Sequence, residues 1–272
     1  MSKKAKLAVL GAGKLGEAIL GGLFEAQLLH PGDVIATAAH RERLEALDAR
    51  FPGVITTLDN RAAAADAEAV LLCVKPKTVP ELAESIAGSV DPATLVITAA
   101  ASVSTAVVER HLAAPVPVVR AMPNTPSLIR KGMTGIAPGA HAEGHHLAAT
   151  QRIFGAVGRT VVVDERHMDA ITGLSASGPA FLYIVIESLA EGGVKVGLPR
   201  DIATELAAQT VFGAGAMVLE TGEHPARLKD AVTTPAGCTI DGILELEDGG
   251  LRVTLIKAIV QAAARASELL EG

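Results

Sequence analysis

Three glycines near the start of the chain have the spacing of a loop that binds a dinucleotide. Gly11, Gly13 and Gly16 follow a short apolar run and open a helical pattern. In such a loop the first glycine permits a tight turn, the second lets the backbone approach a pyrophosphate, and the third lets helix and strand pack closely. The positive end of the helix then faces the anion. The pattern predicts a dinucleotide site, and a glycine-rich turn without a ligand is the alternative.

The residues after the second predicted strand indicate which nucleotide this site prefers. A site for NAD usually offers a carboxylate there, which binds the ribose hydroxyls. Two small residues, Thr37 and Ala38, stand there instead, and Arg41 and Arg43 follow them. A guanidinium suits the 2′-phosphate of NADPH, although Glu42 separates the two arginines. We therefore expect NADPH as the cofactor, with NADH as the alternative; a solvated helix start would also explain these charges.

Short apolar runs alternate with helical patterns through the first part of the chain, which must position these residues. Such alternation predicts βαβ units and a mainly parallel sheet. The predicted helices that separate the earlier strands span residues 15–26, 41–49 and 79–87. The predicted strands are residues 6–10, 33–38, 69–74, 94–98, 116–121 and 160–163, with 134–138 as a further short strand.

Beyond residue 164 the strand signals end, and Ala-, Leu- and Glu-rich stretches predict helices. Pro179 fits the first turn of the first helix, with Ser177 as its cap. Residues 204–218 are apolar around most of the helix and need burial on more than one face. We therefore expect a subunit interface, with an ordinary internal core as the alternative. The predicted helices are residues 179–192, 199–219, 225–232, 239–247 and 250–270.

The predicted fold class is thus α/β, with two domains. A Rossmann-type parallel-sheet domain is expected at residues 1–164, and an all-α domain that binds substrate and forms a dimer at residues 165–272.

Composition argues against several classes of function. The net charge of -6 and an aromatic content of 2% argue against a nucleic-acid binder. Two distant cysteines and no recognisable signal peptide indicate a reducing compartment, so we expect a cytoplasmic protein. The uncharged run at residues 92–108 contains Ser and Thr and does not predict a membrane span. His141, His145 and His146 lack a nearby thiol or acid pair, so we expect a solvated face and no metal.

Five further stretches, in this order along the chain, resemble the pyrroline-5-carboxylate reductase family. Together with the glycine loop they cover essentially the whole chain, and as a set they are specific. They read LCVKP at residues 72–76, RAMPNTP at 120–126, TGLSASGPA at 172–180, EGGVKVGLP at 191–199 and LKDAVTTPAGCTI at 228–240.

The resemblance implies an activity and an assembly. Members of this family reduce (S)-1-pyrroline-5-carboxylate to L-proline, the last step of proline biosynthesis, usually with NADPH and sometimes with NADH. They combine a Rossmann domain with a helical domain that dimerises by interlocking, and the dimers commonly assemble into decamers. The substrate would lie between the sheet edge and the helical domain of a neighbouring subunit.

The resemblance also implies a set of cofactor contacts, mostly at the carboxyl ends of strands, where open α/β sheets bind ligands. Lys75 would contact cofactor phosphate or ribose, or it only caps a strand end. Asn60 precedes an Ala-rich stretch, so a helix cap would explain it equally well. The implied contacts are Gly11, Gly13, Lys14, Leu15, Gly16, Thr37, Ala38, Asn60, Cys73, Val74, Lys75, Pro76, Thr98, Ala99 and Ala100. Arg41 is expected as a further contact from the argument on the 2′-phosphate alone.

The implied substrate site is the segment at residues 235–239. Its backbone N–H groups, including those of Gly237 and Cys238, would hold the substrate carboxylate just before a helix, which is a plausible anion nest. The Thr239 hydroxyl would hydrogen-bond the imine nitrogen. Because the imine is partly protonated at neutral pH, Thr239 would orient the substrate without acting as a true acid. Glu165 would lie near the substrate, or it is only a boundary residue.

Three residues depart from the family pattern. Ala236 and Ala176 stand where the family usually has glycine, and Cys238 replaces a residue that is more often Thr or Ala. If either glycine needs positive φ, the alanine is strained. These departures leave open a reductase for another cyclic imine.

Two further functions remain open at this point. One is a related two-domain dehydrogenase of the 3-hydroxyacid type, which relies on a lysine early in the helical domain. Lys195 is the only early lysine there, and it lies in a Gly-rich turn. The other is an NADP-binding scaffold without catalysis.

Overall fold

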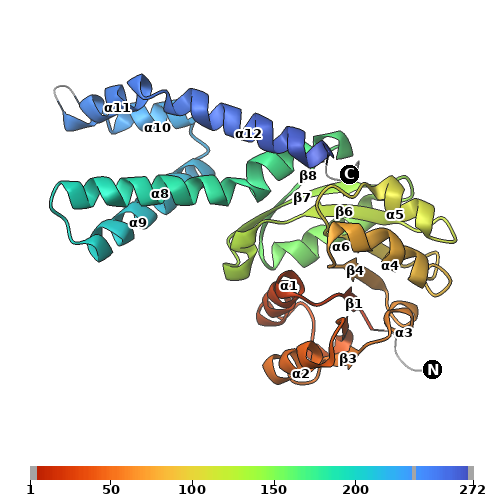
Figure 1. The fold of residues 1–272 in the computed structure, drawn as a ribbon. Coiled ribbons are helices and arrows are strands. Elements are labelled where there is room, and N and C mark those ends of the chain that lie inside the picture. Colours follow the sequence, from red (N-terminus) through yellow and green to blue (C-terminus); the bar gives the residue numbers. More distant parts are fainter. Residues whose placement is uncertain (1–4, 235–236, 269–272) are drawn as a thin grey trace. The chain divides into compact units, whose positions relative to one another are not determined.

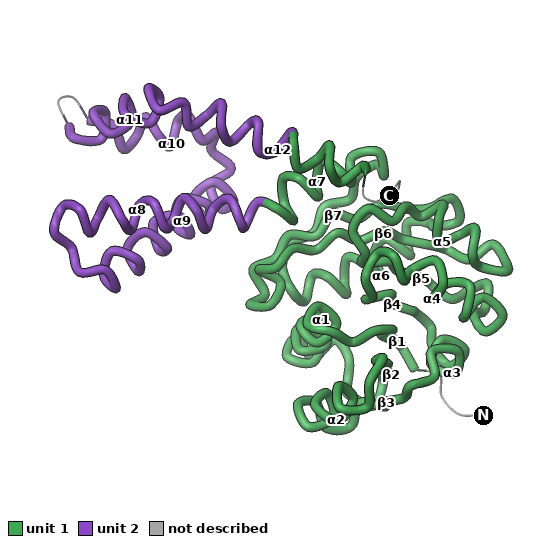
Figure 2. The backbone as a smooth tube through the Cα atoms, in the orientation of Figure 1, with its two compact units in different colours: residues 1–177, 261–272 green, residues 178–260 purple. Residues whose placement is uncertain are grey.

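The computed structural model describes residues 5–234 and 237–268, which form two compact units (Figure 2). The first unit contains the chain up to Ser177 together with its last residues from Gln261. The second unit is Gly178–Val260. Two helical runs therefore connect the units, one at Ser177 and one at Gln261.

The first unit is built on one eight-stranded sheet with the strand order β3-β2-β1-β4-β5-β6-β7-β8. Every neighbouring pair is parallel except β6 and β7. Strands β1, β2, β5 and β6 are buried along their whole length, as a sheet with helices on both faces requires. The predicted, mainly parallel sheet is confirmed. The strands are β1 (Leu7–Leu10), β2 (Val34–Thr37), β3 (Ile55–Thr57), β4 (Ala69–Leu72), β5 (Leu95–Thr98), β6 (Val118–Met122), β7 (Gly132–Pro138) and β8 (Gly158–Val162).

Helices cover both faces of this sheet (Figure 1). On one face α1 (Lys14–Glu25), α2 (Arg41–Arg50) and α6 (Gly144–Gly155) bury their apolar sides in one core. On the other face the corresponding helices are α3 (Asn60–Ala65), α4 (Val79–Ile86) and α5 (Thr105–His111). Shorter helical turns connect these elements: η1 (Pro31–Asp33), η2 (Pro76–Thr78), η3 (Thr125–Ile129), η4 (Glu165–His167) and α7 (Met168–Ile171).

Strand β3 is the one strand that the sequence analysis did not predict. It has only three residues, and Ile55 is 50% exposed at the edge of the sheet. So short a segment carries too little apolar alternation to stand out as a strand.

The second unit is helical, as predicted, but the expected Ser177 cap is wrong. A π-helical segment, η5 (Thr172–Ala176), joins α7 to the next helix, so the chain stays helical through Ser177. There the Ser177 N–H donates to the Thr172 carbonyl. The helices are α8 (Gly178–Lys195), α9 (Arg200–Thr221), α10 (Pro225–Ala231), α11 (Cys238–Asp248) and α12 (Leu251–Glu268).

The second unit has a small core and a largely apolar surface. Its described buried core consists of three alanines, Ala190, Ala203 and Ala207. Large apolar side chains lie on its surface, among them Ile184, Phe212 and Ile256, which are 55–63% exposed. Two helical runs, Glu165–Lys195 and Arg200–Thr221, are long and apolar enough to cross a membrane by length and composition alone. Apolar surface of this extent marks an interaction site.

Candidate active site

The glycine-rich loop between β1 and α1 is tightly packed around two of its glycines. Gly11 has a φ of +82°, and a Cβ at this position would lie 2.4 Å from Val74 Cγ1. A Cβ on Gly16 would lie 3.1 Å from Val9 Cγ1. The first glycine therefore makes the turn, and the third lets α1 pack on the strand, as the motif predicts.

The same loop leaves room for an anion at the start of α1. Around Gly13 the nearest atom that an added Cβ would meet is the Gly11 carbonyl oxygen, 3.9 Å away. No described side chain caps this end of α1. The N–H groups of the first turn, at Lys14, Leu15 and Gly16, have no acceptors within the helix and form its positive end. This geometry fits the pyrophosphate of a dinucleotide.

Thr37 links the glycine loop to the next two elements of the sheet edge. Its hydroxyl accepts a hydrogen bond from Gly11 N at 3.1 Å and donates one to Asn60 Oδ1 at 2.6 Å. Its carbonyl accepts from Ala12 N at 2.7 Å. The structure thus brings Gly11, Thr37 and Asn60 together. The alternative that Asn60 caps α3 is wrong, because Asp59 is the cap and accepts from the N–H groups of the first turn.

Arg41 and Arg43 differ in their side-chain contacts. Arg43 Nε donates to Ala12 O at 2.9 Å, and its guanidinium also pairs with Glu17. Burial raises the pKa of Glu17, but the hydrogen bonds from Arg43 and Arg50 outweigh this and leave the pKa below its ordinary value. The Arg41 side chain has no hydrogen-bond or ion-pair partner among the described residues. It lines a cavity of about 380 Å³ together with Thr57.

The ends of β4 and β5 complete this edge of the sheet. Cys73 N donates to Leu10 O at 2.9 Å, and Ala99 N donates to Leu72 O at 3.1 Å, so both segments lie against neighbouring strands. Burial raises the pKa of the Cys73 thiol to about 12, which keeps it neutral. Lys75 is exposed directly before η2. The implied cofactor contacts Val74, Pro76, Thr98 and Ala100 lie in these same two segments.

The predicted substrate segment lies in the second unit. Gly237 precedes α11, whose first two residues are Cys238 and Thr239, and no described side chain caps this helix end. Pro235 and Ala236 lie outside the described residues. Ala176 lies within the π-helical segment η5 and does not have positive φ, since the described non-glycine residues with positive φ are Gln27, Ser102 and Arg130. The strain expected from a positive φ is therefore absent at Ala176.

The predicted histidine face is not arranged as a metal site. Within residues 5–234 and 237–268, no group of three or more His, Cys, Asp or Glu side chains could hold an ion. His145 lies on the surface, with Nδ1 3.5 Å from Glu143 Oε2.

Comparison with known proteins places the chain in a family. Residues 165–269 match the model described as pyrroline-5-carboxylate reductase dimerisation, and residues 6–102 match the one described as NADP oxidoreductase, coenzyme F420-dependent. A pyrroline-5-carboxylate reductase of Methanosarcina acetivorans is 41% identical over 264 residues, which cover 97% of each chain. One of Synechocystis sp. is 42% identical and covers 97% of this chain and 98% of its own. The chain belongs to the pyrroline-5-carboxylate reductase family.

Solved structures agree with this placement. A pyrroline-5-carboxylate reductase from Coxiella burnetii is 35% identical and matches with a TM-score of 0.91, over 98% of this chain and 99% of that one. Membership of the pyrroline-5-carboxylate reductase family sets aside the 3-hydroxyacid dehydrogenase alternative. Lys195, on which that alternative depended, is the last residue of α8.

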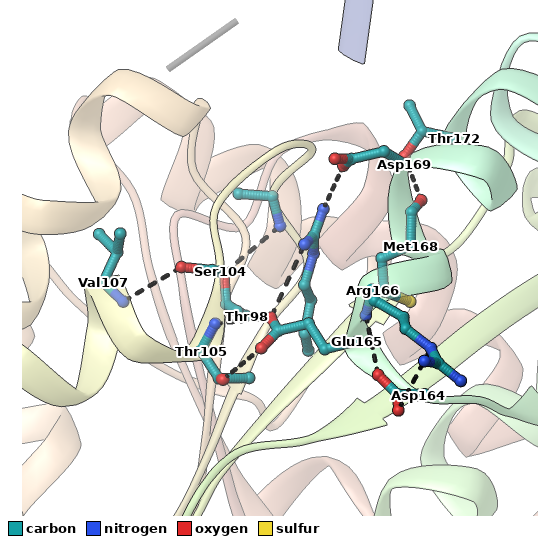
Figure 3. A network of polar contacts seen from close by, with 12 residues as sticks. Thr98, Ser104, Thr105, Val107, Asp164, Glu165, Arg166, Met168, Asp169 and Thr172 are labelled. Atoms are coloured by element: carbon teal, nitrogen blue, oxygen red, sulfur yellow. Dashed lines mark hydrogen bonds and ion pairs between the residues drawn. The ribbon is translucent and has the colours of Figure 1, made fainter. Parts of the chain in front are cut away.

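Sequence reasoning missed a polar network in this member of the pyrroline-5-carboxylate reductase family (Figure 3). Arg120 in β6 is 3% exposed, and its guanidinium lies 3.7 Å from Glu165 Oε1 and 3.3 Å from Asp169 Oδ1. Glu165 also accepts hydrogen bonds from Thr105. Nothing local marks Arg120 or Thr105 as partners of residues about 45 to 60 positions away; only the motif that begins at Arg120 could have drawn attention to it.

Proposed function

We propose that this enzyme reduces (S)-1-pyrroline-5-carboxylate to L-proline with NADPH, the last step of proline biosynthesis. The observation that carries the proposal is the family match over nearly the whole chain, which includes both the glycine loop and the Thr239 segment. A second observation is independent of the family: the uncapped start of α1 fits a dinucleotide pyrophosphate.

The cofactor is proposed to bind along the carboxyl edge of the sheet. Gly13, Lys14 and Leu15 offer backbone N–H groups to the pyrophosphate. Thr37 and Asn60, already joined by a hydrogen bond, hold the ribose beside them. When bound, the reduced nicotinamide supplies the hydride that the imine carbon accepts. The chain's own part is to hold the ring in place and to exclude competing geometries.

Arg41 supports a preference for NADPH over NADH. It is the one of the two neighbouring arginines whose guanidinium has no described partner, so it can pair with a 2′-phosphate without breaking another contact. Glu45 and Asp48 line the same cavity and would repel a phosphate placed beside them. The phosphate is therefore proposed to lie beside Arg41 and away from these two carboxylates.

The substrate carboxylate is proposed to bind at the start of α11. The backbone N–H groups of Gly237 and Cys238 and the helix dipole favour an anion there. The Thr239 hydroxyl, on the first turn of the same helix, orients the imine nitrogen. This arrangement needs no strong general acid, because the imine is partly protonated at neutral pH.

The active form is proposed to be a homodimer formed by the helices of the second unit, with decamers of such dimers as a further expectation. A second copy would cover the apolar faces of α8, α9 and α12, whose large side chains are exposed in one chain. Such coverage accounts for two membrane-length apolar helical runs without a membrane. The enzyme is proposed to act in the cytoplasm on a small-molecule substrate, without nucleic acid.

A direct assay tests the proposed function. Purified enzyme is mixed with NADPH and pyrroline-5-carboxylate, and the loss of the reduced-nicotinamide absorbance is followed. The expected result is oxidation of NADPH that depends on the substrate, with a larger kcat/KM than with NADH. No oxidation beside a working reference reductase would refute the proposal. The six-membered cyclic imine is assayed in parallel, and a clear preference for it would reassign the substrate.

A further inference from the structure

The carboxylate of Glu165 holds the start of α5 by two hydrogen bonds (Figure 3). Thr105 N donates to Oε1 at 2.7 Å, and Thr105 Oγ1 donates to Oε2 at 2.6 Å. Both carboxylate oxygens are therefore engaged by one residue, which is 3% exposed. The two residues are 60 positions apart, so a distant segment supplies a cap to this helix.

Arg120 also contacts the Glu165 carboxylate. Its Nη1 lies 3.7 Å from Glu165 Oε1, and its side chain is only 4% exposed. The same guanidinium pairs with Asp169 Oδ1 at 3.3 Å, while Asp169 Oδ2 accepts a hydrogen bond from Ser267 in α12. A buried guanidinium that contacts two carboxylates restricts the side-chain geometry of both. Glu165 is thus held in a fixed position.

The loop at residues 99–104 is what this arrangement fixes. It runs from the end of β5 to Thr105, and Ser104 closes it by accepting a hydrogen bond from Val107 N at 3.3 Å. Within it Ser102 has a φ of +64°, and its buried hydroxyl has no hydrogen-bond partner among the described residues. Such a conformation persists only where its surroundings determine it. The contact between Thr105 and Glu165 fixes the far end of the loop.

The loop at residues 99–104 begins at the edge of the sheet where the proposed cofactor binds. The strand order reverses between β1 and β4, and a dinucleotide binds across that point. Thr37 and Arg41 lie on the β2 side and would take the adenosine half. The nicotinamide half then lies toward β4 and β5, where the loop at residues 99–104 begins.

We propose that Glu165, backed by Arg120, is a positioning residue that sets the loop at residues 99–104 against the nicotinamide ring. The inference rests on the proposed function for the identity of the cofactor. In this role Glu165 acts through Thr105, which donates one hydrogen bond to each of its carboxylate oxygens.

Loosening this contact should change catalysis more than cofactor binding. The pyrophosphate and adenosine contacts lie at β1 and β2 and stay intact, so KM for NADPH should stay within about twofold of wild type. A ring held less firmly should lower kcat by about 10- to 100-fold. The variants are Glu165→Gln, which keeps the shape and loses the charge, and Thr105→Val, which loses the hydroxyl. Thr105→Ser keeps the hydroxyl and should restore kcat.

The experiment measures kcat, KM for both substrates and the primary isotope effect with 4-deuterated NADPH, on the intact oligomer. Asp164→Asn is the matched control, because Asp164 is the neighbouring exposed acid and its described side-chain contacts are to Arg166. Support would be a lower kcat and a larger isotope effect in Glu165→Gln and Thr105→Val, with Thr105→Ser and Asp164→Asn near wild type. Circular dichroism checks that each variant is folded.

Two outcomes would overturn the inference. One is that Glu165→Gln and Thr105→Val match Asp164→Asn in all measurements. The other is that Glu165→Gln raises KM for the imine alone, which would make Glu165 a direct substrate ligand. The emission of bound NADPH provides a readout that does not need turnover. If wild type binds NADPH but does not reduce the imine, the proposed function fails. The positioning role is then judged by emission alone. Altered emission at unchanged Kd for NADPH in Glu165→Gln and Thr105→Val supports it, and unaltered emission refutes it.

Discussion

Arg43 donates a hydrogen bond from Nε to the carbonyl oxygen of Ala12, in the middle of the glycine-rich loop, with 2.9 Å between the two atoms. The same side chain pairs with Glu17 on α1, so it braces both the loop and the helix that follows. Arg41, two residues earlier, has no such contact among the described residues. The two arginines look equivalent in the sequence, but only Arg41 is free to meet a ligand.

Arg41→Ala should therefore weaken the binding of NADPH and leave the binding of NADH unchanged. We expect KM for NADPH to rise by about tenfold, the scale of one charge-assisted contact, while KM for NADH stays unchanged. Arg43→Ala is the comparison, because loss of its contact with Ala12 should weaken the binding of NADPH and of NADH equally. Steady-state kinetics with each cofactor measure the difference. Equal effects of Arg41→Ala on NADPH and NADH would contradict the assignment of Arg41 to the 2′-phosphate.

Thr239→Ala tests the orienting hydroxyl on α11. We expect kcat/KM for pyrroline-5-carboxylate to fall by about 10- to 100-fold, the scale of one lost orienting contact. Thr221→Ala is a matched control, because the Thr221 hydroxyl donates to the Met217 carbonyl of its own helix. Kinetics of the Thr239 variant equal to those of this control would remove Thr239 from the site.

The parts of the fold that the sequence predicted are those with local signals. The glycine loop follows from spacing within six residues, and buried strands such as β1 and β5 follow from their apolar runs. Ser177 was a misleading local signal. Asn124 donates to the Ser175 carbonyl at 3.1 Å, so a tertiary contact helps to hold the helical turn that passes through this point.

The positioning contact could not be predicted for a related reason. Glu165 and Thr105 are ordinary residues in their own segments, and 60 positions separate them. The pairing of β5, β6, β7 and β8 in one sheet, with β6 and β7 antiparallel, brings the start of α5 beside η4. The buried charge of Arg120 is equally invisible, because a lone arginine in an apolar strand carries no mark of its partners.

Ser102→Gly should stabilise the protein. The substitution removes a left-handed non-glycine residue and a buried hydroxyl that has no partner in the described part of the chain. The entropy cost of glycine opposes this gain. The expected net gain is about 1 kcal/mol, or an increase in Tm of about 2–4 °C. Ser102→Ala removes only the hydroxyl and should gain less. Differential scanning calorimetry of the three proteins measures this order, and a lower Tm for Ser102→Gly would contradict the strain.

Cys73 should make stability depend on alkaline pH. Its folded pKa is raised to about 12, above the ordinary value of 9.0, so the unfolded chain loses the thiol proton first. The contribution of this thiol to the free energy of unfolding is fully present below the ordinary pKa. It is lost as the pH rises toward the folded pKa, by about 1.4 kcal/mol per pH unit. Urea unfolding of wild type and Cys73→Ala across this window measures the difference in slope. Cys238→Ala, which removes the exposed thiol, should follow wild type. If the free energy of unfolding changes equally with pH in wild type and in Cys73→Ala, the raised pKa of the Cys73 thiol is contradicted.

Phe212→Lys tests whether α9 lies in the subunit interface. Phe212 is 55% exposed in one chain, and burial of such a side chain contributes about 2 kcal/mol. Because a two-fold interface contains it twice, its loss should raise the dimer Kd by about a thousandfold, before the added charges repel. Ile55→Lys is the control, because Ile55 is 50% exposed at the edge strand β3 of the first unit, where lysine is tolerated. Sedimentation velocity over a range of concentrations should show dissociation of the Phe212 variant alone. An unchanged sedimentation coefficient for Phe212→Lys down to nanomolar protein would place the interface on other helices.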